Sequence, residues 1–171
     1  MEIKDLKIKA EKLYPELENV VEDRQAVTVL KNLLSSNRGE MAGVLQYIFQ
    51  SVEANKTNQE IGNLFEEISV VEMLHTNLLM NAITEFGGVA KFEDAYGNIF
   101  NGNYINYSLK LKEMLEHNIK AEQQAIEDYL SAIKTVKNES LKQLFERIIE
   151  DEKLHLDAFK TVRDTVQFMS I

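Results

Sequence analysis

Apolar residues recur at helical spacing along most of the chain. Met41, Val44, Leu45 and Ile48 form a stripe three and four residues apart, which predicts a helix over about 37–54. An earlier apolar set predicts a shorter helix over about 23–34, and the pattern leaves open whether the chain bends at residues 35–37. Three longer helices are predicted over about 57–86, 108–136 and 139–168.

Helix-breaking residues mark the connections between these segments. The chain has one proline and seven glycines, four of which lie between Gly87 and Gly102. Thr57 and Glu60 have the spacing of a capping box, so Thr57 is expected to start the helix over about 57–86. Gly87 is expected to end that helix in a left-handed conformation. Lys137 and Asn138 predict a second tight turn.

The connections follow the order short, long, short. Two tight helical hairpins are therefore joined by a crossover of about twenty residues, which differs from a simple up-and-down bundle. Helices of about 28 residues span about 40 Å. Twenty extended residues reach about 66 Å, so the crossover is long enough.

Composition limits the class of protein. The 171 residues fit one domain, with an N-terminal extension over 1–35 and a bundle over 36–168. The chain has no cysteine, which excludes disulfides, iron–sulfur clusters and thiolate-bound zinc. A net charge of −9 argues against a nucleic-acid partner. We see neither a signal peptide nor a membrane-spanning apolar run, and expect a cytoplasmic protein.

Two Glu-x-x-His motifs carry the candidate chemistry. Glu72 and His75 share one helix face, as do Glu152 and His155, because residues three apart are neighbours on a helix. The midpoint between Glu40 and Glu72 is residue 56, in the first tight turn over 55–57. The midpoint between residues 122 and 152 is residue 137, in the second tight turn. Each single glutamate therefore stands level with its motif, about 22–24 Å from the turn. The six residues predict a two-metal site: Glu40, Glu72, His75, Glu122, Glu152 and His155.

The two hairpins also repeat each other in sequence. The string LFEEISVVEMLH (64–75) matches LFERIIEDEKLH (144–155), and Tyr47 and Tyr129 each follow a single glutamate by seven residues. A lone Glu-x-x-His is usually a solvated pair, but here the two motifs use two of only three histidines. Four carboxylates on inward faces are costly to bury unless cations neutralise them. His117 falls off the ligand face and is expected to be exposed.

These motifs resemble the ferritin-like di-metal carboxylate superfamily, which includes bacterioferritins, rubrerythrins and manganese catalases. The resemblance covers residues 36–165 and implies an all-α ferritin-like four-helix bundle. It also implies that Glu72 and Glu152 bridge two Fe or two Mn ions, with the other four ligands terminal. Asp151 is placed to hold the outer nitrogen of His75. Tyr47 and Tyr129 are either hydrogen-bonded to ligand carboxylates or satisfied core tyrosines, and Gly43 and Ala125 leave room for a small oxidant.

The chain departs from these relatives at several positions. Rubrerythrins carry a further glutamate where this chain has Ala125, and they usually carry a four-cysteine rubredoxin domain. The fifth helix that helps bacterioferritins form a cage is not expected after His155. Met73 occupies the position of the haem-ligating methionine of bacterioferritins, but a methionine on an amphipathic helix is usually a core or interface residue, so haem is not expected.

The favoured interpretation is a di-iron or di-manganese oxidoreductase that turns over hydrogen peroxide. The alternative is a ferroxidase that oxidises Fe(II) with O₂ for storage. A third possibility is a structural or coat component whose metal only stabilises the fold. By family analogy we expect a homo-oligomer, a dimer, and a peroxidase-type reaction would need a separate electron donor.

Overall fold

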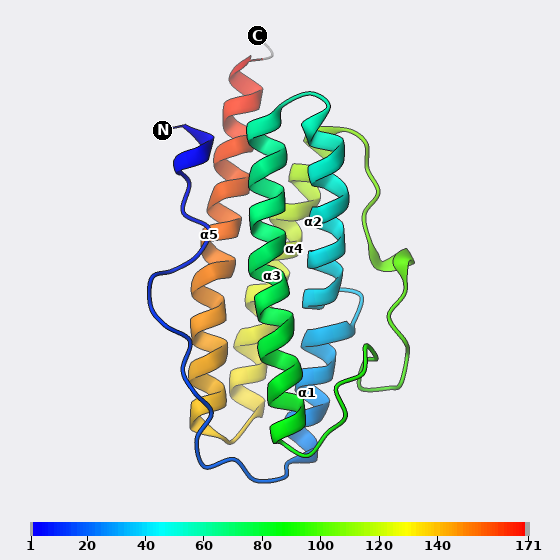
Figure 1. Cartoon of the computed structure of the whole chain (residues 1–171), viewed down its shortest axis with the longest axis vertical. Coiled ribbons are helices and arrows are strands. Elements are labelled where there is room, and N and C mark those ends of the chain that lie inside the picture. Colours follow the sequence, from blue (N-terminus) through cyan, green and yellow to red (C-terminus); the bar gives the residue numbers. More distant parts are fainter. Residues whose placement is uncertain (1, 170–171) are drawn as a thin grey trace.

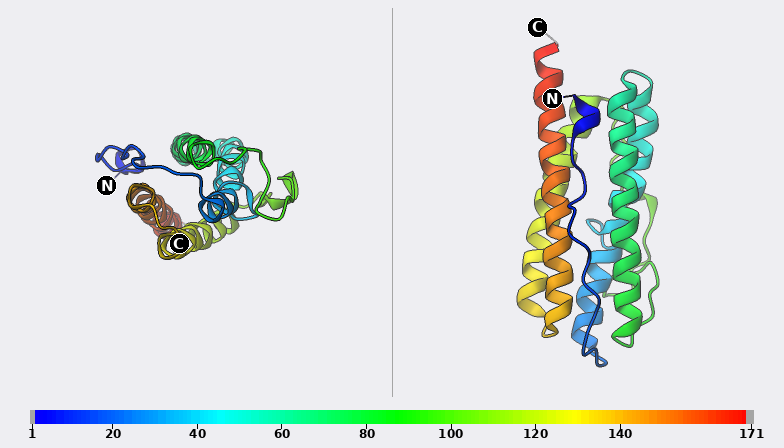
Figure 2. Two further views of the ribbon diagram at one scale, coloured as in Figure 1. Left: turned by 90° about the horizontal axis from the view of Figure 1, so that it is seen from below. Right: turned by 60° about the vertical axis from the view of Figure 1, so that its left-hand side comes forward.

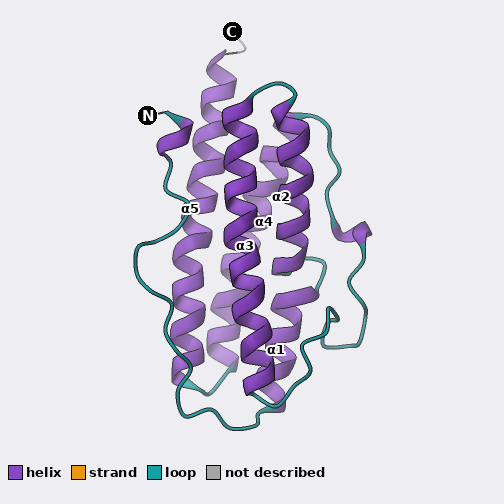
Figure 3. Cartoon of the chain, viewed as in Figure 1, coloured by secondary structure: helices purple, strands orange, loops and turns teal. Residues whose placement is uncertain are grey.

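The computed structural model describes residues 2–169, and their regular structure is helical apart from one isolated bridge between Glu93 and Ile99 (Figures 1 and 3). The elements are η1 (Ile3–Asp5), α1 (Arg24–Ser35), α2 (Glu40–Asn55), α3 (Gln59–Glu85), η2 (Gly102–Tyr104), α4 (Leu111–Thr135) and α5 (Glu139–Met169). Helices α2 and α3 form one hairpin, and α4 and α5 form the other. The crossover between α3 and α4 runs along the outside of the bundle (Figure 1). The predicted four-helix fold is confirmed.

The first position of the bundle is occupied by two helices placed nearly end to end. Helix α1 ends at Ser35 and α2 begins at Glu40, so the chain bends between them and α2 starts three residues later than predicted. A Cβ at Gly39 would lie 2.6 Å from the Leu33 carbonyl oxygen, so the bend requires a residue without a side chain. Leu30 and Leu34 of α1 are fully buried in the core. The first 35 residues are therefore not all an extension, because α1 belongs to the bundle.

Capping interactions fix the ends of α3. The N-cap is Asn58, whose Oδ1 accepts a hydrogen bond from the Ile61 amide at 3.2 Å. The prediction of Thr57 as the cap was wrong, because the Thr57 hydroxyl instead donates to the Ala54 carbonyl at 3.2 Å. At the other end Gly87 has φ of +83°, and the Gly88 amide donates to the Ile83 carbonyl at 2.8 Å. This is the left-handed termination that the glycine pair predicted.

The core consists of two apolar clusters with a layer of buried polar side chains between them. One cluster includes Leu79 and Phe145, and the other includes Phe65 and Phe159. The polar layer lies at the middle of α3 and α5 and contains the six predicted ligands. Such a layer is costly in the middle of a bundle unless its charges are compensated.

The N-terminal segment, residues 6–23, crosses the bundle without regular structure. It lies along the seam between α3 and α5 (Figure 2). Its C-terminal end is Asp23, whose side chain caps α1 by accepting from the Gln25 and Ala26 amides. Among the described residues, no helix is long and apolar enough to cross a bilayer.

Candidate metal centre

The structure brings all six predicted ligands to one level of the bundle. One group consists of Glu40, Glu72, His75 and Glu152, and the other of Glu72, Glu122, Glu152 and His155. Within each group the donor atoms lie within 4.8 Å of one another, and all the residues are buried. Glu72 and Glu152 belong to both groups. The geometry thus forms two adjacent four-residue sites with two shared carboxylates.

Both histidines turn Nδ1 toward the carboxylates. Nδ1 of His75 lies 3.1 Å from Glu152 Oε1 and 3.4 Å from Glu40 Oε2. Nδ1 of His155 lies 3.0 Å from Glu72 Oε1 and 3.8 Å from Glu122 Oε2. Each imidazole therefore presents one nitrogen to its own group of carboxylates.

The two tyrosines connect the hairpins. Tyr47 of α2 donates a hydrogen bond to Glu122 Oε1 of α4, and Tyr129 of α4 donates to Glu40 Oε1 of α2. Both tyrosines are almost completely buried. Of the two interpretations open from the sequence, the structure supports hydrogen bonding to the carboxylates, and the two bonds preserve the two-fold pattern of the repeat.

Burial and neighbouring charges shift the pKa values of the glutamates in opposite directions. Burial and then the Glu72 carboxylate raise the pKa of Glu40 well above its ordinary value. Burial and then Glu152 do the same to the pKa of Glu122. Burial also acts to raise the pKa of Glu72, but the neighbouring side chains of Glu40 and the two histidines hold it below its ordinary value. These pKa shifts favour the protonated forms of Glu40 and Glu122 and the ionised form of Glu72.

The donor set fits divalent Fe or Mn. Nδ1 of both histidines and Oε1 of Glu152 are buried and make no hydrogen bond among the described residues. Such groups are costly to bury without a partner, and these three point into the centre. Mixed carboxylate and imidazole ligands suit Fe and Mn. Two divalent cations at this position would satisfy the unpaired atoms and offset the charge of the four glutamates.

Asp151 holds His75 from behind, at the contact expected from the sequence. Its Oδ2 lies 3.2 Å from Nε2 of His75. Asp151 also accepts from the hydroxyl of Tyr14 at 2.5 Å and pairs with Arg147 at 2.8 Å. Burial acts to raise the pKa of Asp151, but these hydrogen bonds, beginning with that from His75, lower it to about 2.

Sequence reasoning missed Tyr14 and Arg147. A signal for the arginine was present, because Arg147 and Asp151 are four residues apart on one helix face. Arg147 and Asp151 also differ from their counterparts in the internal repeat, because the equivalent residues in α3 are Glu67 and Val71. No comparable signal pointed to Tyr14, which lies in a segment without periodicity and reaches Asp151 across 137 residues of chain.

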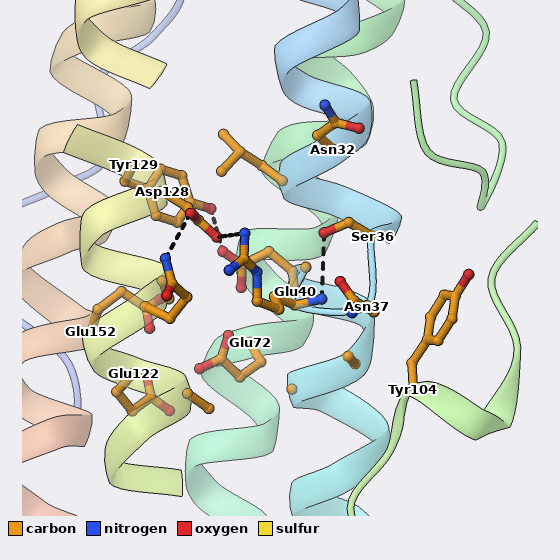
Figure 4. A pocket seen from close by; sticks show the side chains of 18 of the residues that line it. Asn32, Ser36, Asn37, Glu40, Glu72, Tyr104, Glu122, Asp128, Tyr129 and Glu152 are labelled. Atoms are coloured by element: carbon orange, nitrogen blue, oxygen red, sulfur yellow. Dashed lines mark hydrogen bonds and ion pairs between the residues drawn. The ribbon is translucent and has the colours of Figure 1, made fainter. Parts of the chain in front are cut away.

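A cavity of about 880 Å³ leads to the centre from the side of α2 and α4 (Figure 4). Glu40, Glu72, Glu122 and Glu152 line its inner end, together with Gly43 and Ala125. A Cβ at Gly43 would lie 3.5 Å from the Glu72 carboxylate, so a larger side chain there would fill space beside the ligand. Arg38 and Asp128, which pair at 3.5 Å, also line this cavity. Small molecules can therefore reach one side of the carboxylate cluster.

Two residues considered from the sequence lie away from the centre. His117 is exposed, as expected, and lines the cavity without joining either group of ligands. Met73 is 54% exposed on α3.

Among models of known protein families, the one described as rubrerythrin matches residues 31–162. The chain belongs to the rubrerythrin family. The matched region includes all six predicted ligands and most of the five α-helices. No curated protein sequence matches this family member.

Solved structures share the fold of this rubrerythrin-family chain. KatB, a manganese catalase from Anabaena PCC7120, superposes with a TM-score of 0.82 at 22% identity, over 92% of this chain and 80% of that one. The bacterioferritin of Desulfovibrio desulfuricans, solved with its diiron site, gives a TM-score of 0.69 at 23% identity, over 83% of this chain and 80% of that one. At these identities the likeness concerns the fold.

Proposed function

We propose that the chain is a di-metal oxidoreductase that removes hydrogen peroxide, using two Fe or two Mn ions per chain. The observation that carries the proposal is the convergence of six buried ligands at the inner end of a cavity. The rubrerythrin family, and the manganese catalase and diiron bacterioferritin that share its fold, support a redox role.

Each ligand has a proposed place. Glu40 and His75 would hold one ion, and Glu122 and His155 the other. Glu72 and Glu152 would bridge the two, since these are the residues common to both groups. When bound, the two ions supply the pair of electrons that cleaves the O–O bond of peroxide.

The protein residues control access and proton placement. The cavity beside Gly43 and Ala125 admits a small oxidant, while the apolar clusters above and below exclude bulk water. The hydroxyls of Tyr47 and Tyr129 hold the carboxylates of Glu122 and Glu40, which limits how these ligands rotate.

A catalase-type reaction fits a chain without cysteine. It converts two molecules of hydrogen peroxide into one O₂ and two H₂O, and therefore needs no external reductant. A peroxidase-type reaction would consume two electrons from a separate donor for each peroxide. The sequence offers no cysteine ligand for an iron–sulfur or rubredoxin centre that could deliver them.

The deciding experiment compares oxidants. Metal-free protein is loaded anaerobically with two Fe(II) or two Mn(II) per chain, and hydrogen peroxide or O₂ is mixed in a stopped-flow spectrometer. We expect faster reaction with peroxide, and O₂ evolution if the reaction is catalase-type. Faster reaction of the Fe(II) form with O₂, continuing as Fe(II) is added, would establish the ferroxidase alternative. Metal-dependent stability without turnover would indicate a structural centre.

A matched pair of variants links the activity to the site. Glu122→Gln removes a buried ligand charge, and we expect the loss of one metal per chain and of most turnover. Glu127→Gln makes the same change at an exposed position of the same helix. If both variants kept full activity, the chemistry would lie elsewhere.

A further inference from the structure

The N-terminal segment reaches the back of the metal centre. The backbone amide of Ala10 donates to Asp151 Oδ1 at 2.7 Å, and the hydroxyl of Tyr14 donates to Asp151 Oδ2 at 2.5 Å. The segment thus covers the α3–α5 side of the centre (Figure 2). The cavity is lined mainly by residues of α2 and α4.

Arg147 fixes this segment to α5. It is completely buried, and its Nε and Nη2 donate to the carbonyls of Lys12 at 2.5 Å and Ala10 at 2.8 Å. Its guanidinium lies 4.3 Å from the centre of the Tyr14 ring, a cation–π distance. A buried guanidinium must be paired, and here two carbonyls and Asp151 supply the partners. The segment and the arginine therefore stabilise each other.

Asp151 and Tyr14 both contact one histidine, His75. Asp151 lies 3.2 Å from Nε2 of His75, and the Tyr14 ring meets the imidazole edge-on with ring centres 6.1 Å apart. These two neighbours fix the ring plane of His75 and direct Nδ1 at Glu40 and Glu152.

The other histidine lacks this support. Nε2 of His155 is buried and makes no hydrogen bond among the described residues. The residue equivalent to Asp151 in the repeat is Val71, which has no polar group to offer. The two groups of ligands thus share Glu72 and Glu152, but they differ in which residues contact the far side of each imidazole.

We propose that residues 10–14 are a positioning element for the His75 half of the centre, acting through Asp151, and that they make the two metal positions unequal. The ion held by Glu40 and His75 binds first and more tightly, and Tyr14 is a positioning residue for it. Partners behind a ligating histidine typically change metal affinity by about 10–100-fold. The inference rests on the proposed metal centre but not on which oxidant it uses.

Mn(II) titration of the metal-free full chain by calorimetry tests the inequality. The wild type should bind two ions in separate steps whose affinities differ about 10–100-fold. His155→Ala should abolish the weaker step and keep the tighter one. Two equal steps in the wild type, or loss of the tighter step in His155→Ala, would overturn the proposal.

Tyr14→Phe tests the positioning role. It removes the hydroxyl and keeps the ring, so the tighter step should weaken several-fold while the weaker step stays unchanged. The control is Ser140→Ala. It removes a different hydrogen bond of the N-terminal segment, which the Glu18 amide donates to Ser140 Oγ at 2.8 Å. This control should leave both steps unchanged, although both variants lower stability.

A second measurement separates positioning from folding. In Zn(II)-loaded protein, NMR of the imidazole nitrogens resolves three histidines, and the Nε2 proton of His75 should exchange slowly with water. Tyr14→Phe should accelerate that exchange, and Ser140→Ala should not. Equal weakening of both steps, or unchanged exchange in Tyr14→Phe, would overturn the positioning role. No metal binding by the wild type would instead overturn the proposed function, and this inference with it.

Discussion

Residues of one hairpin have counterparts in the other, and the two tyrosines make equivalent hydrogen bonds. Tyr47 and Tyr129 lie seven residues after Glu40 and Glu122, yet each donates to the glutamate of the other helix. The seven-residue spacing placed each tyrosine on the ligand face, but the crossing of the partners required the positions of both helices. Sequence alone therefore found the residues without their pairing.

Replacing these tyrosines should have similar effects. Tyr47→Phe and Tyr129→Phe each leave a buried carboxyl without its donor, so we expect each to lower the free energy of unfolding of the metal-free protein by about 1–3 kcal/mol. Urea denaturation measures the change. Tyr107→Phe is the control, because Tyr107 is half exposed. If only one variant lowered the free energy of unfolding, the two hydrogen bonds would not contribute equally to stability.

The direction of the glutamate pKa shifts predicts how metal binding depends on pH. Burial raises the pKa of Glu40 and Glu122, which favours their protonated forms in the metal-free chain. Bound cations need ionised ligands, so uptake should release protons and metal affinity should fall as the pH is lowered. Calorimetry in buffers of different ionisation enthalpy counts the protons. Uptake without release would mean that the centre is already ionised.

At the scale of elements, the break between α1 and α2 was the least predictable feature. The apolar pattern runs through residues 24–34 and resumes at 41, which is compatible with one helix or two. Packing decided it, since Gly39 touches the end of α1. The hairpins were predictable because ligand spacing, turns and repeat all agreed, whereas residues 6–23 carry no periodicity that fixes their path.

Gly39→Ala tests the importance of this break. The added Cβ would lie 2.6–2.8 Å from backbone atoms of Leu33 and Leu34, which cannot move as a side chain can. Because Glu40 is the next residue, we expect α2 to shift, stability to fall by about 1–3 kcal/mol, and metal affinity to fall with it. Thermal melts and metal titration report the two effects. Unchanged affinity would mean that Glu40 tolerates the shift.

At the scale of the whole molecule, metal and fold should be coupled. Ions bind the folded centre, so metal at 100 times its Kd should stabilise the chain by about 2.7 kcal/mol per site. A chelator should therefore lower Tm, and the increment should vanish in Glu72→Ala, which lacks a carboxylate common to both groups. Differential scanning calorimetry with and without chelator measures it. A Tm that does not respond to chelator would leave the centre without a role in stability.

The crossover of residues 86–110 is the only covalent link between two halves that each carry half of the ligands. With ions bound between Glu72 and Glu152, coordination becomes a second link across the same divide. A chain cleaved near Tyr96, which is 88% exposed, would then be held together by the apolar clusters and by the metal, so bound ions should lower the dissociation constant of the two fragments. In such a protein, releasing the ions would weaken the association of the fragments.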